Sequence, residues 1–149
     1  MHVNTEYREA QKGSQMITGV YGFNIAVKDL EAATARYETL LGTAGKPLAP
    51  NDFAFPGLIG TRFDFDGLAI ILITSTEPDT SVAKFLDNKG EGLFLVSLKT
   101  SDMAAAMTGL KEQGITPLLD PARDTKYGAV TFLHPKSANG VQLEILETS

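Results

Sequence analysis

Glu144 is the side chain of this sequence whose position best suits chemistry. It lies in a strand-like stretch between Leu143 and Ile145. Alternation along a strand points those two residues to one face, and Glu144 with Gln142 to the other. A lone carboxyl group in apolar surroundings has a raised pKa, because burial disfavours its charged form. We therefore predict that Glu144 is a general base or binds a polar ligand group. A solvated or salt-bridged strand residue is the alternative.

Other polar residues are candidates for binding a ligand. Asn24 and Ser97 lie on strand-like stretches and suit hydrogen bonding to a ligand or to each other, with ordinary satisfaction of polar neighbours as the alternative. The candidates for contact with an anionic group are Arg62, Arg123, Lys126 and Tyr127. Each of these four is otherwise an ordinary surface residue.

The composition excludes several classes of protein. The chain has 149 residues, of which 43% are hydrophobic and 21% charged, as in a globular protein. Its net charge of −5, with scattered basic residues, argues against nucleic-acid binding. The absence of cysteine excludes disulfides and thiol nucleophiles, and it agrees with the cytoplasmic location that we expect. No apolar run reaches the roughly 18 residues of a membrane span.

The sequence pattern predicts the same succession of elements twice. Residues 20–27 alternate like a strand, and Asp29 then caps a helix that ends at Gly42. Residues 93–98 form a second strand, followed by a helix that Asp102 caps. The remaining predicted strands are 62–65, 68–73, 115–119, 129–134 and 141–146, with loops over 46–60 and 120–127 and a short helix around 82–86.

A shift of 73 residues superposes these two successions. It carries Asp29 to Asp102 and the hairpin Gly67 to Gly140, and it carries residues 32–33 to 105–106. Agreement at a strand end, a helix cap and a hairpin favours a duplication. We therefore predict an α+β fold of two tandem βαβββ modules. Because each helix covers one face of its sheet, the free faces form paired half-barrel sheets around a shared cavity. The predicted segments are a loose tail 1–16, a module 17–76, a linker 77–91 and a module 92–149.

The duplicated pattern resembles the glyoxalase, or vicinal oxygen chelate, superfamily, which includes bleomycin resistance proteins and dioxygenases. The resemblance covers roughly residues 18–148 and rests on the stretches FNIAVKDLEAATARYETLLG, SDMAAAMTGLKEQGITPLL and YGAVTFLHPKSANGVQLEILE. The last stretch is most similar to the branch of methylmalonyl-CoA epimerases and lactoylglutathione lyases.

The resemblance implies where a metal would bind. Metal-using members hold a divalent ion with four His, Gln or Glu side chains, and the ion polarises a substrate carbonyl. The corresponding positions are Gly22, Ile71, Leu95 and Glu144, of which only Glu144 offers a donor atom. One carboxylate does not hold an ion tightly. We therefore expect no cofactor and a degenerate metal site, with a weak divalent ion at Glu144 left open.

Three functional classes remain open. The first is an isomerase or lyase of the epimerase and lactoylglutathione lyase type, acting on a small carboxylate or acyl-CoA-like ligand. The second is a non-catalytic, metal-free binding protein of the drug-resistance type, and the third is a structural protein with a filled cavity. For the first class we expect Glu144 as the catalytic residue, and in general we expect a homodimer as the assembly. The expected ligand-binding residues are Asn24, Arg62, Ile71, Leu95, Ser97, Tyr127 and Gln142.

Overall fold

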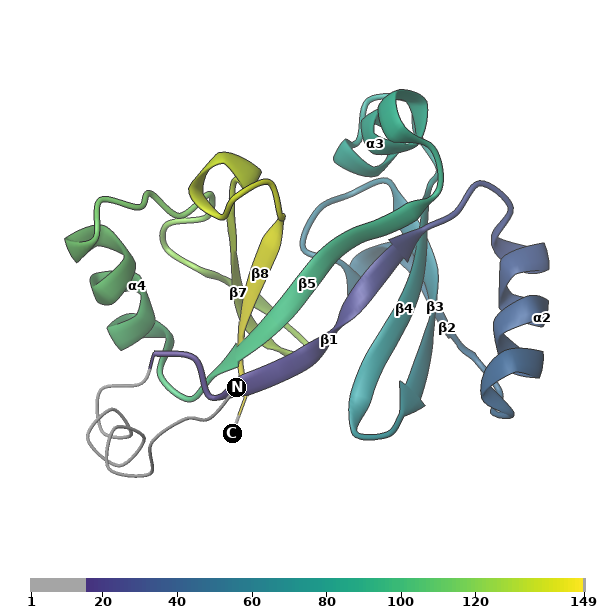
Figure 1. The fold of residues 1–149 in the computed structure, drawn as a ribbon, viewed down its shortest axis with the longest axis horizontal. Helices are drawn as coiled ribbons and strands as arrows, with labels where there is room; N and C mark the ends of the chain where they lie inside the picture. Colours follow the sequence, from purple (N-terminus) through teal and green to yellow (C-terminus); the bar gives the residue numbers. More distant parts are fainter. Residues whose placement is uncertain (1–15, 149) are drawn as a thin grey trace.

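The computed structural model describes residues 16–148, so the predicted tail 1–16 lies, apart from Met16, outside the described residues. These residues form one eight-stranded sheet in the order β2-β3-β4-β1-β5-β8-β7-β6, together with three α-helices (Figure 1). The strands are β1 (Gly19–Ala26), β2 (Lys46–Leu48), β3 (Leu58–Phe65), β4 (Leu68–Ser75), β5 (Gly92–Thr100), β6 (Arg123–Thr125), β7 (Gly128–Leu133) and β8 (Leu143–Glu147). The α-helices are α2 (Leu30–Leu41), α3 (Ser81–Lys89) and α4 (Met103–Glu112), and 3-10 turns lie at Pro50–Asp52 and Pro135–Ser137.

The sheet consists of two equivalent halves, which confirms the predicted α+β fold of two βαβββ modules. Within each half the first and last strands pair in parallel, β1 with β4 and β5 with β8. The halves join where β1 and β5 pair antiparallel across the middle of the molecule (Figure 1). Phe23 pairs with Val96, its own equivalent in the repeat, so the pseudo-twofold axis passes through this pair. The module boundaries stay a prediction.

The local signals of the repeat are present in both halves. Asp29 and Asp102 each accept a 3.0 Å hydrogen bond from the backbone N–H three residues later, which caps α2 and α4. The hairpin residues 66–67 and 139–140 all have positive φ, between 52° and 91°. This left-handed conformation suits Asp, Asn and Gly, the residue types found there.

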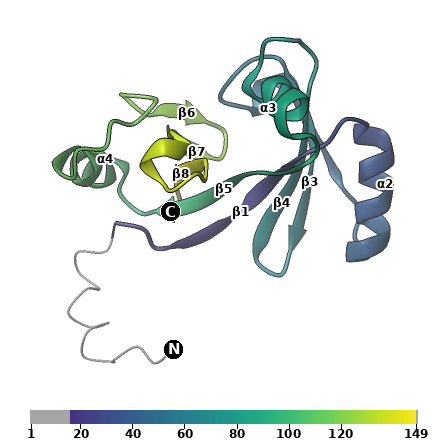
Figure 2. The same cartoon turned by 45° about the horizontal axis from the view of Figure 1, so that its top comes forward.

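Apolar side chains pack on both faces of the sheet. On the outer face, α2 covers Phe63 and Leu72, and α4 covers Leu133 and Ile145. The opposite face carries a third cluster that includes Leu95. Figure 2 shows that the two halves of the sheet curl toward one another on the side away from α2 and α4. Among residues 16–148, no helix is long and apolar enough to cross a membrane.

The strand predicted at 115–119 is wrong. Leu118 donates one backbone hydrogen bond to the Phe132 carbonyl, as a strand would. At Leu119, however, the Thr131 hydroxyl contacts both the N–H, at 3.2 Å, and the carbonyl, at 2.8 Å. Because a side chain satisfies these groups, no backbone ladder forms.

Two regions predicted as loops contain short strands at the edges of the sheet. The region 46–60 holds β2 and the start of β3, and the region 120–127 holds β6. The predicted linker contains α3, which is longer than the helix expected around 82–86.

Candidate functional site

The curled sheet encloses a cavity with a volume of ≈ 90 Å³. All eight residues that the sequence singled out as catalytic or ligand-binding line it: Asn24, Arg62, Ile71, Leu95, Ser97, Tyr127, Gln142 and Glu144. They come from strands of both halves, from the turn between β6 and β7, and, for Gln142, from the position just before β8. A cavity of this volume is large enough for a few water molecules or a small acyl group.

Strand register arranges the inward residues in two rows. In the first row, Ile71 pairs with Arg62 on one side and with Asn24 on the other. In the second row, Ser97 pairs with Glu144 and with Gly22. Asn24 therefore stands beside Ile71 as Ser97 stands beside Glu144, because a shift of 73 residues relates the two pairs.

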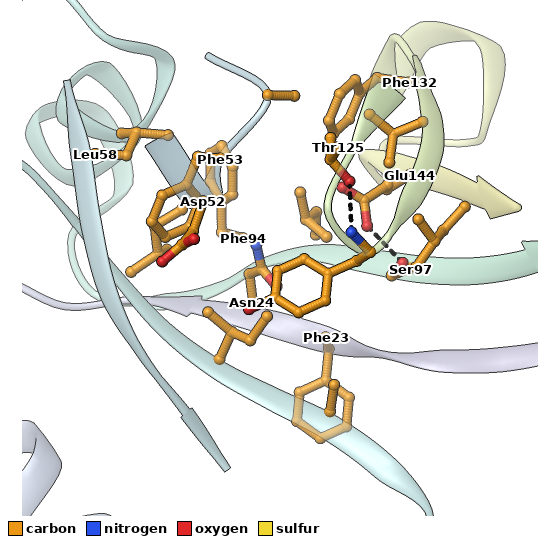
Figure 3. A pocket seen from close by; sticks show the side chains of 18 of the residues that line it. Phe23, Asn24, Asp52, Phe53, Leu58, Phe94, Ser97, Thr125, Phe132 and Glu144 are labelled. Atoms are coloured by element: carbon orange, nitrogen blue, oxygen red, sulfur yellow. Dashed lines mark hydrogen bonds between the residues drawn. The ribbon is translucent and has the colours of Figure 1, made fainter. Parts of the chain in front are cut away.

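Glu144 is a buried acidic side chain that lines the cavity. The Ser97 hydroxyl donates a 2.6 Å hydrogen bond to Glu144 Oε1 (Figure 3). Burial raises the pKa of Glu144 above its ordinary value, and the hydrogen bond from Ser97 opposes this only in part. A carboxylate whose pKa is raised is a stronger base than an exposed glutamate.

Arg62 carries the positive charge of the cavity. Its Nε donates a 3.0 Å hydrogen bond to Asp64 Oδ1, and Nη2 lies 3.0 Å from the same oxygen. The guanidinium lies 5.2 Å from the ring centre of Tyr21 and 5.0 Å from that of Tyr127. Burial tends to lower the pKa of Arg62, but Asp64 and Tyr21 outweigh it and the pKa is raised. Arg62 therefore stays charged.

Two loops close the cavity across the halves. Asp52 Oδ1 lies 2.6 Å from Lys126 Nζ, and this ion pair lowers the pKa of Asp52. Arg123 binds the Ala54 carbonyl and lies over the Phe55 ring. Arg123 and Lys126 thus hold the first half of the chain, whereas the sequence suggested them as contacts for an anionic ligand.

The sequence did not identify several residues that line the cavity. These are chiefly Tyr21, Asp52, Phe53 and Phe55. Tyr21 enters the cavity because the pairing of β1 with β5 has an irregularity between Val20 and Gly22, which alternation does not reveal. Figure 3 shows Asp52 and Phe53 on the side of the cavity away from Glu144 and Ser97. No motif marks the loop that carries Asp52 and Phe53.

The four strand positions do not fit a divalent ion. Three of them, Gly22, Ile71 and Leu95, have no donor atom, and a Cβ at Gly22 would lie 1.8 Å from the Ala69 carbonyl oxygen. Position 22 therefore has no room for a ligating side chain unless β4 moves. Among residues 16–148, no group of three or more His, Cys, Asp and Glu side chains is placed to hold a metal. Glu144 alone is a poor metal site.

Comparison with known proteins places this chain in a family. Residues 23–132 match the family described as Glyoxalase/Bleomycin resistance protein/Dioxygenase superfamily. The chain is 34% identical over 126 residues to the ethylmalonyl-CoA/methylmalonyl-CoA epimerase of Cereibacter sphaeroides, covering 81% of this chain and 91% of the relative.

Two solved structures of methylmalonyl-CoA epimerases are similar to the whole fold. The enzyme from Mycobacterium tuberculosis superposes with a TM-score of 0.79 at 27% identity, over 91% of each chain. A Streptomyces coelicolor epimerase variant in complex with 2-nitronate-propionyl-CoA superposes with a TM-score of 0.73 at 27% identity, over 89% of this chain and 99% of that one. The chain therefore belongs to the Glyoxalase/Bleomycin resistance protein/Dioxygenase superfamily and is similar in sequence and fold to methylmalonyl-CoA epimerases.

Proposed function

We propose that the protein binds an acyl-CoA with a carboxylate on its α-carbon and moves the proton of that carbon. The observation that carries this proposal is the buried carboxyl group of Glu144. The Ser97 hydroxyl donates a hydrogen bond to it, and burial raises its pKa. A proton next to a thioester carbonyl is acidic enough for such a base to remove. The epimerases to which the chain is similar have substrates of this class in their names.

A second cavity supports the choice of an acyl-CoA. It has a volume of ≈ 730 Å³ and shares Phe94, Phe132 and Gln142 with the first cavity. It extends along α3, where Lys84 and Lys89 join its lining, and the carboxylates of Glu77 and Asp79 line it as well. The small cavity then suits the acyl group, and the larger one has the size for a pantetheine arm with phosphates near the two lysines.

The proposal assigns roles to the predicted site residues. Glu144 accepts and returns the proton, and Ser97 orients its carboxyl group. Arg62 and Asn24 bind polar atoms of the acyl group, while Ile71 and Leu95 exclude water from the reacting carbon. Tyr127 and Gln142 complete the polar lining.

Proton exchange in heavy water tests the reaction directly. The purified protein is incubated with methylmalonyl-CoA in D₂O, and ¹H NMR follows the loss of the C2 proton against an enzyme-free control. We expect exchange well above the control rate. Calorimetric titration with methylmalonyl-CoA, and with propionyl-CoA as the analogue without a carboxylate, measures binding independently.

The outcomes separate the functional classes. Exchange together with binding supports the proposal, whereas tight binding without exchange identifies a non-catalytic binding protein. Absence of both contradicts an acyl-CoA ligand. We also propose that the protein is a homodimer and is located in the cytoplasm. Light scattering after size exclusion tests the homodimer.

A further inference from the structure

The charges that line the cavity are few and unevenly placed. Among the described residues, three charged side chains line it, those of Asp52, Arg62 and Glu144. Lys126 balances Asp52 at a distance of 2.6 Å. This leaves Arg62 as the cation and Glu144 as the acid that face a ligand.

Arg62 belongs to a cluster with a net positive charge. Its partner Asp64 also binds Lys46, with 2.9 Å between Lys46 Nζ and Asp64 Oδ2. The single negative charge of Asp64 is thus shared by Lys46 and Arg62, so it does not neutralise both. The Arg62 side chain keeps 15% of its surface exposed, whereas Lys46 keeps 70%. Of the two cations in this cluster, Arg62 lines the cavity and Lys46 does not.

Arg62 lies next to the two first-half positions, 22 and 71, that have no metal-ligating side chain. On β3 it pairs with Ile71, the first-half equivalent of Glu144. Tyr21, whose ring centre lies 5.2 Å from the Arg62 guanidinium, immediately precedes Gly22, the other first-half position without a donor. A fixed cation therefore lies beside the positions where a divalent ion would be bound in metal-using members.

The geometry of Arg62 suits the binding of an oxygen atom. The Tyr21 and Tyr127 rings and the Asp64 carboxylate hold the guanidinium in one orientation. The contacts with Asp64 use Nε and Nη2, and neither of them uses Nη1. A charged donor that is held in place and shielded from water stabilises developing negative charge strongly, since no reorganisation is needed during the reaction.

We propose that the Arg62 guanidinium binds the thioester carbonyl oxygen of the acyl-CoA and takes the part that a divalent ion plays in metal-using members. Glu144 removes the C2 proton, the C2–H electron pair forms a C1–C2 double bond, and the carbonyl π pair moves to the oxygen that Arg62 holds. Return of the proton to C2 reverses each change, so the step needs no oxidant or reductant. This inference rests on the proposed function.

The test measures C2 proton exchange in D₂O with protein that was treated with a chelator and shown by elemental analysis to be metal-free. We expect the wild-type rate to survive this treatment and Arg62→Ala to lower it about 100-fold or more. Arg62→Lys, which keeps the charge but not the planar fork, should be intermediate. Free guanidinium at millimolar concentration should restore part of the Arg62→Ala activity, an effect that a merely structural role would not produce.

Two variants act as controls. Arg36 is an exposed arginine on α2, away from the cavity, so Arg36→Ala should keep the wild-type rate. The double variant Arg62→Ala with Glu144→Gln should not regain C2 proton exchange when guanidinium is added. Circular dichroism melts show whether each variant is folded, and Arg62→Lys carries the test if Arg62→Ala is not.

Each outcome decides between the two proposals. Exchange that requires added divalent metal overturns the role of Arg62 and leaves the proposed function standing. A folded Arg62→Ala protein with wild-type exchange overturns the role of Arg62 in the same way. If the wild-type protein exchanges no proton, with or without metal, both proposals fail together.

Discussion

The two halves of the sheet share one architecture and differ in the residues they direct into the cavity. In the second half, Ser97 and Glu144 form a hydrogen-bonded pair between β5 and β8. In the first half, Asn24 and Ile71 occupy the equivalent places between β1 and β4. The acid therefore comes from one half and the cation, Arg62, from the other. A duplicated scaffold can divide the parts of a proton-transfer site between its copies, because a strand face holds its backbone geometry when its side chains change.

The strands also pack differently at equivalent positions. Leu95 lies buried at 3% exposure and lines the cavity, whereas its equivalent Gly22 lies against the backbone of β4. The second half thus accommodates a side chain at a position where the first half accepts only glycine. Four predictions compare the two halves, from the largest expected effect to the smallest.

Glu144→Gln should cause the largest loss of activity. Glutamine keeps the size of the side chain but cannot accept the proton, so we expect C2 exchange to fall about 100- to 10,000-fold. Calorimetry should show that acyl-CoA binding changes little. Ile71→Gln places the same side chain at the equivalent position of the first half and should cost far less activity. Full activity in Glu144→Gln would show that the chemistry does not reside in the second half.

Gly22→Ala should destabilise the fold by about 3 kcal/mol. The added Cβ would meet the Ala69 carbonyl oxygen at 1.8 Å, and this atom belongs to the backbone of β4 and cannot swing away. Urea unfolding measures the change. Gly19→Ala is the matched control on the same strand, since its Cβ would meet only the end of the Lys99 side chain at 3.1 Å, and we expect a change within about 0.5 kcal/mol. Equal stability of the two variants would mean that position 22 has room for a side chain.

The stability of the protein should fall as pH rises, because of Glu144. Its pKa in the folded protein lies above the ordinary value of 4.5, so between these two values the folded state binds more protons than the unfolded state. The stabilising contribution is complete below pH 4.5 and is lost as pH rises through the folded pKa, at about 1.4 kcal/mol per unit of upward shift.

Urea unfolding at several pH values compares wild type with Glu144→Gln, which should lack this part of the slope. Asp52 and Asp64 act in the opposite sense, because their pKa values lie below the ordinary 3.8, and their effect is confined to more acidic solutions. Identical slopes for the two proteins above pH 4.5 would contradict a raised pKa at Glu144.

The helix caps should show the halves behaving alike. Asp29→Ala and Asp102→Ala each remove one 3.0 Å hydrogen bond to a backbone N–H, and each should cost about 1 kcal/mol of folding free energy. Thermal melts of both variants measure the effect. A large difference between them would show that the two helices do not contribute equally to a shared fold.

Much of the fold could be predicted because its signals are local. Asp29 and Asp102 cap their helices through bonds that span three residues, and the hairpin at 66–67 depends on two residues that tolerate positive φ. Alternation along β8 and the 73-residue repeat together predicted that Glu144 and Ser97 face one cavity, and the structure brings them within 2.6 Å. The sequence by itself also determined that positions 22 and 71 carry no metal-ligating side-chain atom, since residue type alone decides that point.

Only the tertiary structure decided how the halves meet. Arg62 lies between Tyr21 and Tyr127, and Lys126 pairs with Asp52, although 65 residues separate Arg62 from Tyr127 and 74 separate Asp52 from Lys126. The side chain of Thr131 binds the backbone of Leu119, where the sequence predicted a strand. These contacts depend on the curl of the sheet and on irregular strand pairing, both of which arise from packing summed over the whole chain, and no local pattern records them.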